Sequence, residues 1–283
     1  MYGSVMNVPK CRAKNGNVIC GIECFGMRGN MERQWEAADR LRVLNRDVIK
    51  YMAMFTMLLN HIGHMFLTGG TPFHEILEDV GFFTAPVMCY FMVEGYAYTR
   101  SKARYGLRLF LFAVLSQIPF ELAFGQRGLN MIYTLFCCFL ILVVMEKVSS
   151  PVLQAGCVMF LILATVNGDW PIVAPLLTFL LCRSGGDRRK QAVSFGVVYL
   201  LFSVLNTQNY MSGQQGAWTV YTVVHAALSG VGILVAALTV LVFYNGERAE
   251  KGRNFSKWFF YIFYPAHLLV LYMMKEGLHK IQF

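Results

Sequence analysis

Long apolar segments are the feature that most constrains this chain. They recur about nine times, in blocks of about 20 residues, which is the helix length that crosses a bilayer's hydrocarbon core. Only 14% of the 283 residues are charged, against about a quarter in a soluble domain. The sequence therefore predicts an all-α fold: a polytopic membrane helix bundle with about nine (eight to ten) transmembrane helices. The expected spans are 48–68, 80–99, 107–124, 130–146, 151–167, 170–183, 191–206, 219–244 and 256–275. Residues 151–183 are either two spanning helices or one re-entrant pair.

Lysine and arginine are concentrated in alternate connections between these spans. Residues 1–47 are rich in them, whereas the segment "TGGTPFHEILED", expected to be an outer loop, has none. This alternation places the N-terminus in the cytoplasm. We therefore divide the chain into a polar cytoplasmic leader, 1–47, expected to be disordered in part, and one transmembrane domain, 48–283. The net charge of +9 comes from the inner loops, so we expect no nucleic-acid partner.

Cysteine usage gives no reason to expect a metal. Five of the eight cysteines lie in apolar spans, where cysteine behaves as a small hydrophobic residue. The other three, Cys11, Cys20 and Cys24, have no fourth ligand at zinc spacing. We predict no metal site.

The first span, "KYMAMFTMLLNHIGH", carries polar residues that are costly in lipid. Lys50 and His61 fall on one helix face, ~16 Å apart along the axis, with Asn60 beside the histidine. Two interpretations stay open for each. Lys50 is either an edge lysine that extends toward water or part of a site. His61 is either satisfied by a neighbouring helix or catalytic.

Other spans carry polar groups at similar depth. Glu94, on the second span, needs a partner such as Arg100, Arg108 or Lys50, and a structural ion pair is as reasonable as a catalytic role. The last span, "KWFFYIFYPAHLLVLYMM", has a proline followed by a histidine at mid-membrane. Further polar groups are expected to support the site: Tyr264 and His267 on the last span, Glu121 on the third span, and Asp169 at the outer edge.

Histidine is the common general base because its pKa lies near neutral pH. A buried histidine with a basic entrance on the cytoplasmic side fits one chemistry well. An anionic activated donor would bind inside and extend a neutral arm to the histidine, and an acceptor would arrive from the other side.

Four blocks of the chain resemble the TraX family, membrane proteins associated with N-terminal acetylation of conjugative pilin. They are "LNRDVIKYMAMFTMLLNHIGHMF", "FMVEGYAYTRSKARYGLRLFLFAVLSQIPFEL", "LNMIYTL" and "KWFFYIFYPAHLLVLYMM", and the resemblance covers roughly residues 44–275. The family is grouped with the acyltransferase-3 superfamily, so the resemblance implies acetyl-CoA as cytoplasmic donor, His61 as the catalytic histidine, and Lys50 near the donor. One departure is Asn60, where the family usually has aspartate. Either Glu121 or Asp169 supplies the missing acid, or the activity of this chain is reduced or altered.

The expected function is therefore that of an acetyl-CoA-dependent acyltransferase of the bacterial cytoplasmic membrane. In it, His61 is the base; His267, Tyr264 or Asn60 stabilises the oxyanion. The CoA phosphates are held by Lys50 with Arg100, Arg104 or Arg108. The acceptor is left open between a protein amine, a glycan and a lipid, and membrane lipids are the other expected partners. The alternatives are a proton-coupled transporter and a non-catalytic membrane scaffold.

Overall fold

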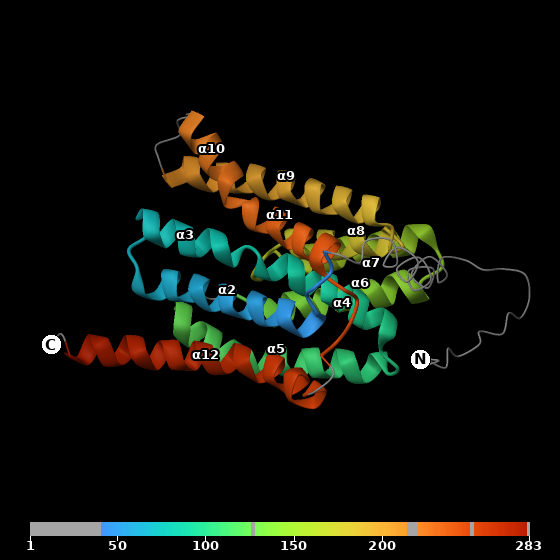
Figure 1. The fold of residues 1–283 in the computed structure, drawn as a ribbon, viewed down its shortest axis with the longest axis horizontal. Helices are drawn as coiled ribbons and strands as arrows, with labels where there is room; N and C mark the ends of the chain where they lie inside the picture. Colours follow the sequence, from blue (N-terminus) through green and yellow to red (C-terminus); the bar gives the residue numbers. More distant parts are fainter. Residues whose placement is uncertain (1–40, 126–127, 214–219, 250–251, 282–283) are drawn as a thin grey trace, which may run out of the picture.

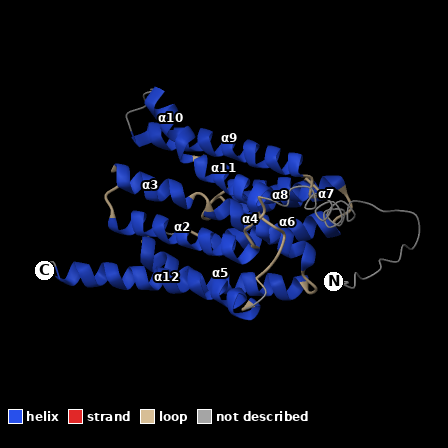
Figure 2. Ribbon diagram, in the orientation of Figure 1, coloured by secondary structure: helices blue, strands red, loops and turns tan. Residues whose placement is uncertain are grey.

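The computed structural model describes residues 41–125, 128–213, 220–249 and 252–281, and this part of the chain is helical without β-strands (Figures 1 and 2). The all-α fold class is thereby confirmed. The predicted leader lies almost wholly outside the described residues. The helices are α2 (Arg46–Phe66), α3 (Pro72–Gly81), α4 (Thr84–Tyr98), α5 (Lys102–Phe124), α6 (Met131–Lys147), α7 (Pro151–Ala164), α8 (Val173–Arg183), α9 (Arg188–Gly213), α10 (Val220–Ser229), α11 (Val231–Leu238), the π-helix η1 (Thr239–Phe243) and α12 (Arg253–Ile281).

Three helical stretches are long and apolar enough to cross a membrane: Pro72–Tyr98, Lys102–Phe124 and Thr222–Phe243. Their outward faces are apolar. Ile118 of α5, for example, is 68% exposed, as expected of a side chain that contacts lipid. The protein therefore has the character of a membrane protein. The larger number of crossings stays a prediction.

The segment expected to be an outer loop is partly helical, and this expectation was wrong. Helix α3 begins where the Thr71 hydroxyl accepts a hydrogen bond from the His74 amide, and Pro72 occupies its first turn. Its apolar residues recur at helical spacing, a signal that the absence of lysine and arginine obscured. α3 packs against α2 at very close range. A Cβ added to Gly81 would lie 2.3 Å from the Asn60 Cβ.

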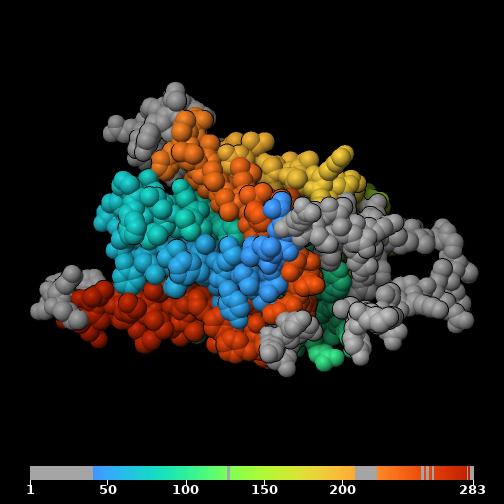
Figure 3. Space-filling model, in the orientation of Figure 1, coloured from blue at the N-terminus to red at the C-terminus, as the bar shows by residue number. Residues whose placement is uncertain are grey.

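Helix α4 lies at the centre of the bundle and is buried along nearly its whole length. It contacts α2, α6, α8 and α11. Helices α12 and α5 run along one side of the molecule and α9 to α11 along the other, with α2 between them (Figure 1). Figure 3 shows α2, α3 and α12 side by side on the surface facing the viewer. α12 packs on both α5 and α2, and α6 packs on both α5 and α4. These five helices surround one interior space.

At one end of the bundle, the segment after η1 pairs with the chain entering α2. Leu44 and Tyr244 form a parallel bridge, and the Arg46 amide donates to the Glu247 carbonyl at 2.9 Å. The Asp47 carboxylate accepts a hydrogen bond from the Ala249 amide at 2.8 Å. These bonds hold the start of α2 and the 244–249 segment together at the mouth of that interior space.

Candidate functional site

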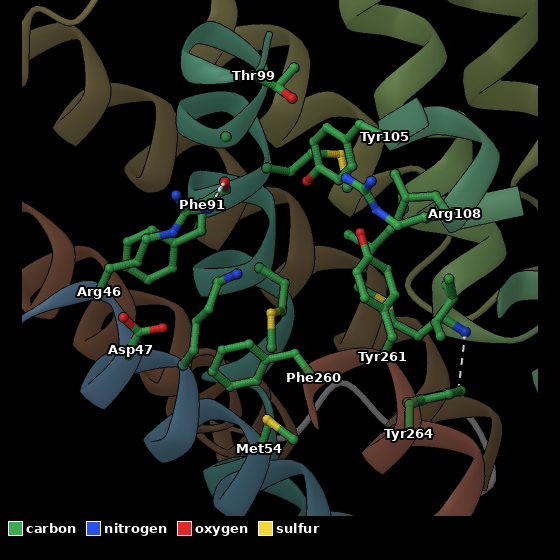
Figure 4. A pocket seen from close by; sticks show the side chains of 18 of the residues that line it. Arg46, Asp47, Met54, Phe91, Thr99, Tyr105, Arg108, Phe260, Tyr261 and Tyr264 are labelled. Atoms are coloured by element: carbon green, nitrogen blue, oxygen red, sulfur yellow. Dashed lines mark hydrogen bonds between the residues drawn. The ribbon is translucent and has the colours of Figure 1, made fainter. Parts of the chain in front are cut away.

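A cavity of about 460 Å³ lies between α2, α4, α5, α6 and α12 (Figure 4). One part of its wall is strongly basic, and Asp47 is the one carboxylate among the described residues that line it. Figure 4 shows Arg46 and Arg108 reaching toward the cavity from opposite sides. The cationic residues in the wall are Arg46, Lys50, Arg100, Arg108 and Arg248.

The cavity becomes apolar with depth. α2 and α4 run antiparallel: Arg46 lies beside Glu94, and the Thr56 and Thr84 hydroxyls are 2.9 Å apart. The basic residues therefore lie near the start of α2 and the end of α4, and the opposite end of the cavity lies one to two turns beyond Lys50. The residues there are mostly methionines, with one threonine and one tyrosine: Met54, Met57, Thr84, Met88, Met131 and Tyr264.

A buried ion pair fixes one wall of the basic end. The Arg46 Nε lies 3.7 Å from the Glu94 Oε2, and Tyr244 donates its hydroxyl proton to Glu94 Oε1 at 2.6 Å. Arg46 also donates to the Phe91 carbonyl at 3.1 Å. Glu94 thus has a buried structural partner, but it is Arg46, one turn before Lys50, and none of the three cations expected from the sequence.

Lys50 lines the cavity as expected for a site residue. Its ammonium lies over two aromatic faces, 4.9 Å from the Phe260 ring centre and 5.9 Å from that of Phe91. The structure shows no ion pair between this ammonium and a carboxylate of the described residues. An anion entering the cavity therefore meets a lysine that is oriented by aromatic rings and is not neutralised by contact with an acid.

Just beyond the deep end of the cavity, His61 and His267 form a hydrogen-bonded pair. His61 Nδ1 lies 2.7 Å from His267 Nε2, and the planes of the two rings are nearly parallel, with an angle of 4° between them. His267 Nδ1 is 2.8 Å from the Phe263 carbonyl oxygen. Both histidines are only 6% exposed. Tyr264 lines the cavity and lies edge-on to both rings, so it connects the pair to the cavity wall.

The structure brings several of the expected residues together. His61, His267 and Tyr264 meet at the deep end, and Lys50, Arg100 and Arg108 line the basic part. These contacts agree with the predicted one-face arrangement of α2. The role of each residue stays a prediction.

Other expected residues lie elsewhere. The Asn60 amide donates to the Glu78 carbonyl at 3.1 Å, so it faces α3 and not the histidine pair. Arg104 is exposed and is not part of the cavity wall. Glu121 is exposed and accepts a hydrogen bond from Gln117 on its own helix. Asp169 lies in the turn before α8, and burial raises the pKa of its carboxyl to about 6.

Sequence reasoning missed two of the cavity's cations. Arg46 lies four residues before Lys50, so helical spacing places it on the same face of α2, and this signal was available. Arg248 comes from an irregular loop, and no periodicity in the sequence points it inward. Burial and the nearby Arg46 guanidinium lower the pKa of Arg248. Two cations held close together in this way favour a bound anion.

Comparison with known proteins supports the family resemblance. Residues 45–275 match the model of the family described as TraX protein. The chain is also 28% identical over 237 residues to the probable fimbrial assembly protein FimC, serogroup H1, of Dichelobacter nodosus, covering 79% of this chain and 92% of that protein. No solved structure matches the chain. Because the family match covers most of its length, the chain belongs to the TraX family.

Proposed function

We propose that this protein is an integral-membrane acyltransferase that moves an acetyl group from cytoplasmic acetyl-CoA to a hydroxyl or amine acceptor. The observation that carries the proposal is the arrangement along α2: a cavity lined by five cations leads toward a buried histidine on the same helix. A donor with several phosphates and a long neutral arm matches both parts of this arrangement.

The dimensions support this donor. Lys50 and His61 are separated by ~16 Å along the α2 axis. The pantetheine arm of CoA is about as long as four residues of extended chain, or roughly 14 Å. With the phosphates held by Lys50, Arg46 and Arg108, the thioester would arrive beside the histidine pair. Arg100 and Arg248, which also line the cavity, add positive charge for the rest of the nucleotide.

The chemistry proposed for the pair is general base catalysis. His61 takes the proton from the acceptor oxygen or nitrogen while that atom attacks the thioester carbon. The new bond to the acceptor forms, the carbon–sulfur bond breaks, and the proton passes from His61 to the departing sulfur. The Tyr264 hydroxyl accepts a hydrogen bond from the Met131 amide, so its own proton stays free to donate, and we propose the oxyanion as its acceptor.

The proposed orientation follows from the donor. Acetyl-CoA is a cytoplasmic metabolite, so the basic end of the cavity would face the cytoplasm, in agreement with the cytoplasmic N-terminus expected from loop charges. The proposal includes a bundle of about nine crossings in the bacterial cytoplasmic membrane. The FimC relative is named for fimbrial assembly, which favours an acceptor belonging to a surface structure, either a protein amine or a glycan hydroxyl.

The test is release of free thiol from acetyl-CoA by the purified, detergent-solubilised protein, with and without added amine or hydroxyl acceptors. Wild type should release thiol, and His61→Ala should lose at least about 100-fold in rate. His225→Gln is the matched control, because His225 is also a hydrogen-bonded histidine but pairs with Glu75, away from the cavity. Retention of most activity in H61A, in folded protein, would refute the proposed mechanism.

A further inference from the structure

We infer that His267 is a positioning residue that fixes the tautomer of His61, so that His61 Nε2 is the atom that accepts the acceptor's proton. This inference rests on the proposed function and assigns roles within the same site. It is carried by the chain of two hydrogen bonds that joins His61, His267 and the Phe263 carbonyl.

The tautomers follow from the acceptor at the end of that chain. A carbonyl oxygen only accepts hydrogen bonds, so His267 Nδ1, at 2.8 Å from the Phe263 oxygen, must carry the proton. In the neutral ring, His267 Nε2 then has only its lone pair. His61 Nδ1, 2.7 Å away, must therefore be the donor to it. This leaves His61 Nε2 unprotonated, which is the state that a general base requires.

This arrangement answers the question raised by Asn60. An aspartate next to the histidine would orient the ring, but here the Asn60 side chain is hydrogen-bonded to α3 and faces away from the pair. His267 and a main-chain carbonyl perform the orienting role. This chain of two hydrogen bonds resembles a catalytic triad, with a second imidazole in the middle position and a helix carbonyl as the terminal acceptor.

Packing holds both rings in place. The His267 ring stacks on Phe263, with ring centres 4.8 Å apart, and the Phe124 ring lies edge-on to His61 at 5.2 Å. Phe263 and His267 lie four residues apart on α12, so the helix fixes the accepting carbonyl one turn before the imidazole. When His61 gains a proton at Nε2, its Nδ1–H bond to His267 becomes charge-assisted and stabilises the imidazolium.

Two amide substitutions separate positioning from packing. A glutamine amide reaches about as far as the imidazole Nε2, so His267→Gln retains an acceptor for His61. An asparagine amide reaches about as far as Nδ1, so His267→Asn contacts only the Phe263 carbonyl. We expect H267N and H267A to lose about 10- to 100-fold in kcat with the KM for acetyl-CoA changed less than about threefold. H267Q should recover most of that loss.

The direct readout is the ¹⁵N imidazole spectrum of wild type labelled at histidine, with assignments from His61→Gln and His267→Gln. Protons on Nδ1 of both rings support the inference, whether or not transfer is detected. A proton on Nε2 of His61 overturns it, as does an H267N enzyme as active as H267Q. If both Nδ1 protons are present but wild type transfers no acetyl group from acetyl-CoA, the result would count against the proposed function and not against this inference.

Discussion

Replacement of Glu94 by glutamine tests whether the buried ion pair at the basic end stabilises the fold. Glutamine keeps nearly the same shape and an oxygen that accepts from the Tyr244 hydroxyl, but it removes the negative charge facing Arg46. Both members of the pair are almost fully buried, with side-chain exposures of 9% and 5%. The substitution therefore isolates the charge.

The expected loss follows from the distance. Opposite charges 3.7 Å apart attract by ~4 kcal/mol at an effective dielectric constant of ~20. Breaking a buried pair by removing one partner costs about 3–5 kcal/mol, because the remaining charge stays buried without compensation. Arg46 also donates to the Phe91 carbonyl, which offsets part of the loss. We expect Glu94→Gln to lower the free energy of unfolding by about 2–4 kcal/mol.

The assay is thermal unfolding of the detergent-purified protein, where this loss corresponds to a drop of roughly 5–10 °C in the apparent Tm. Tyr244→Phe is the matched comparison, because it removes only the hydroxyl that donates to Glu94 and should cost about 1.5–3 kcal/mol. Glu94→Ala should cost more than either. An E94Q protein with the Tm of wild type would refute the argument that this charge pair stabilises the bundle.

Three further predictions concern helix packing, pH and anion binding. Gly81→Ala should lower the free energy of unfolding by more than about 2 kcal/mol, because the new Cβ would lie 2.3 Å from that of Asn60. Adding Asn60→Gly to this variant should recover much of the loss. Equal Tm values for the single and double variants would contradict the prediction. The pKa of Asp169 is about 6 in the fold against 3.8 unfolded, so its ionisation destabilises the protein as pH rises from 4 to 6. The free energy of unfolding of Asp169→Asn should therefore match that of wild type near pH 4 and exceed it by up to ~3 kcal/mol at pH 7, as measured by unfolding at both pH values. A gain in stability that does not depend on pH would contradict this prediction. Arg108→Gln should weaken CoA binding about tenfold, whereas replacement of the exposed Arg104 by glutamine should change the affinity little. Equal losses of CoA affinity in the two variants, measured by titration, would contradict a specific role for Arg108 and show that only the overall charge matters.

The sequence predicted the elements that depend on local pattern. Apolar length identified the helices, and the eleven-residue spacing of Lys50 and His61 placed both on one face of α2, which the structure bears out. Helix α3 was missed because its carboxylates and its one histidine resemble a loop when only lysine and arginine are counted. Its helical period was present in the same residues.

The remaining site geometry depends on contacts between distant segments. His61 and His267 are 206 residues apart, and only the packing of α12 on α2 shows that they bond to each other. Arg248 enters the cavity because residues 244–249 pair with the start of α2, a register that no single-segment pattern specifies. Asn60 was expected beside the catalytic ring, but adjacent residues on a helix point about 100° apart. The Asn60 side-chain amide instead donates a hydrogen bond to the Glu78 carbonyl of the closely packed α3.

The most direct test of the central claim is a calorimetric titration of the detergent-purified protein with CoA and with pantetheine, which has the same arm but no phosphates. If the basic cavity binds the donor's phosphates, CoA binds at least about 100-fold more tightly than pantetheine, and Lys50→Ala weakens CoA about tenfold. The exposed Lys190→Ala should leave both affinities unchanged. Equal binding of CoA and pantetheine, or unaltered CoA affinity in folded K50A protein, would contradict the account.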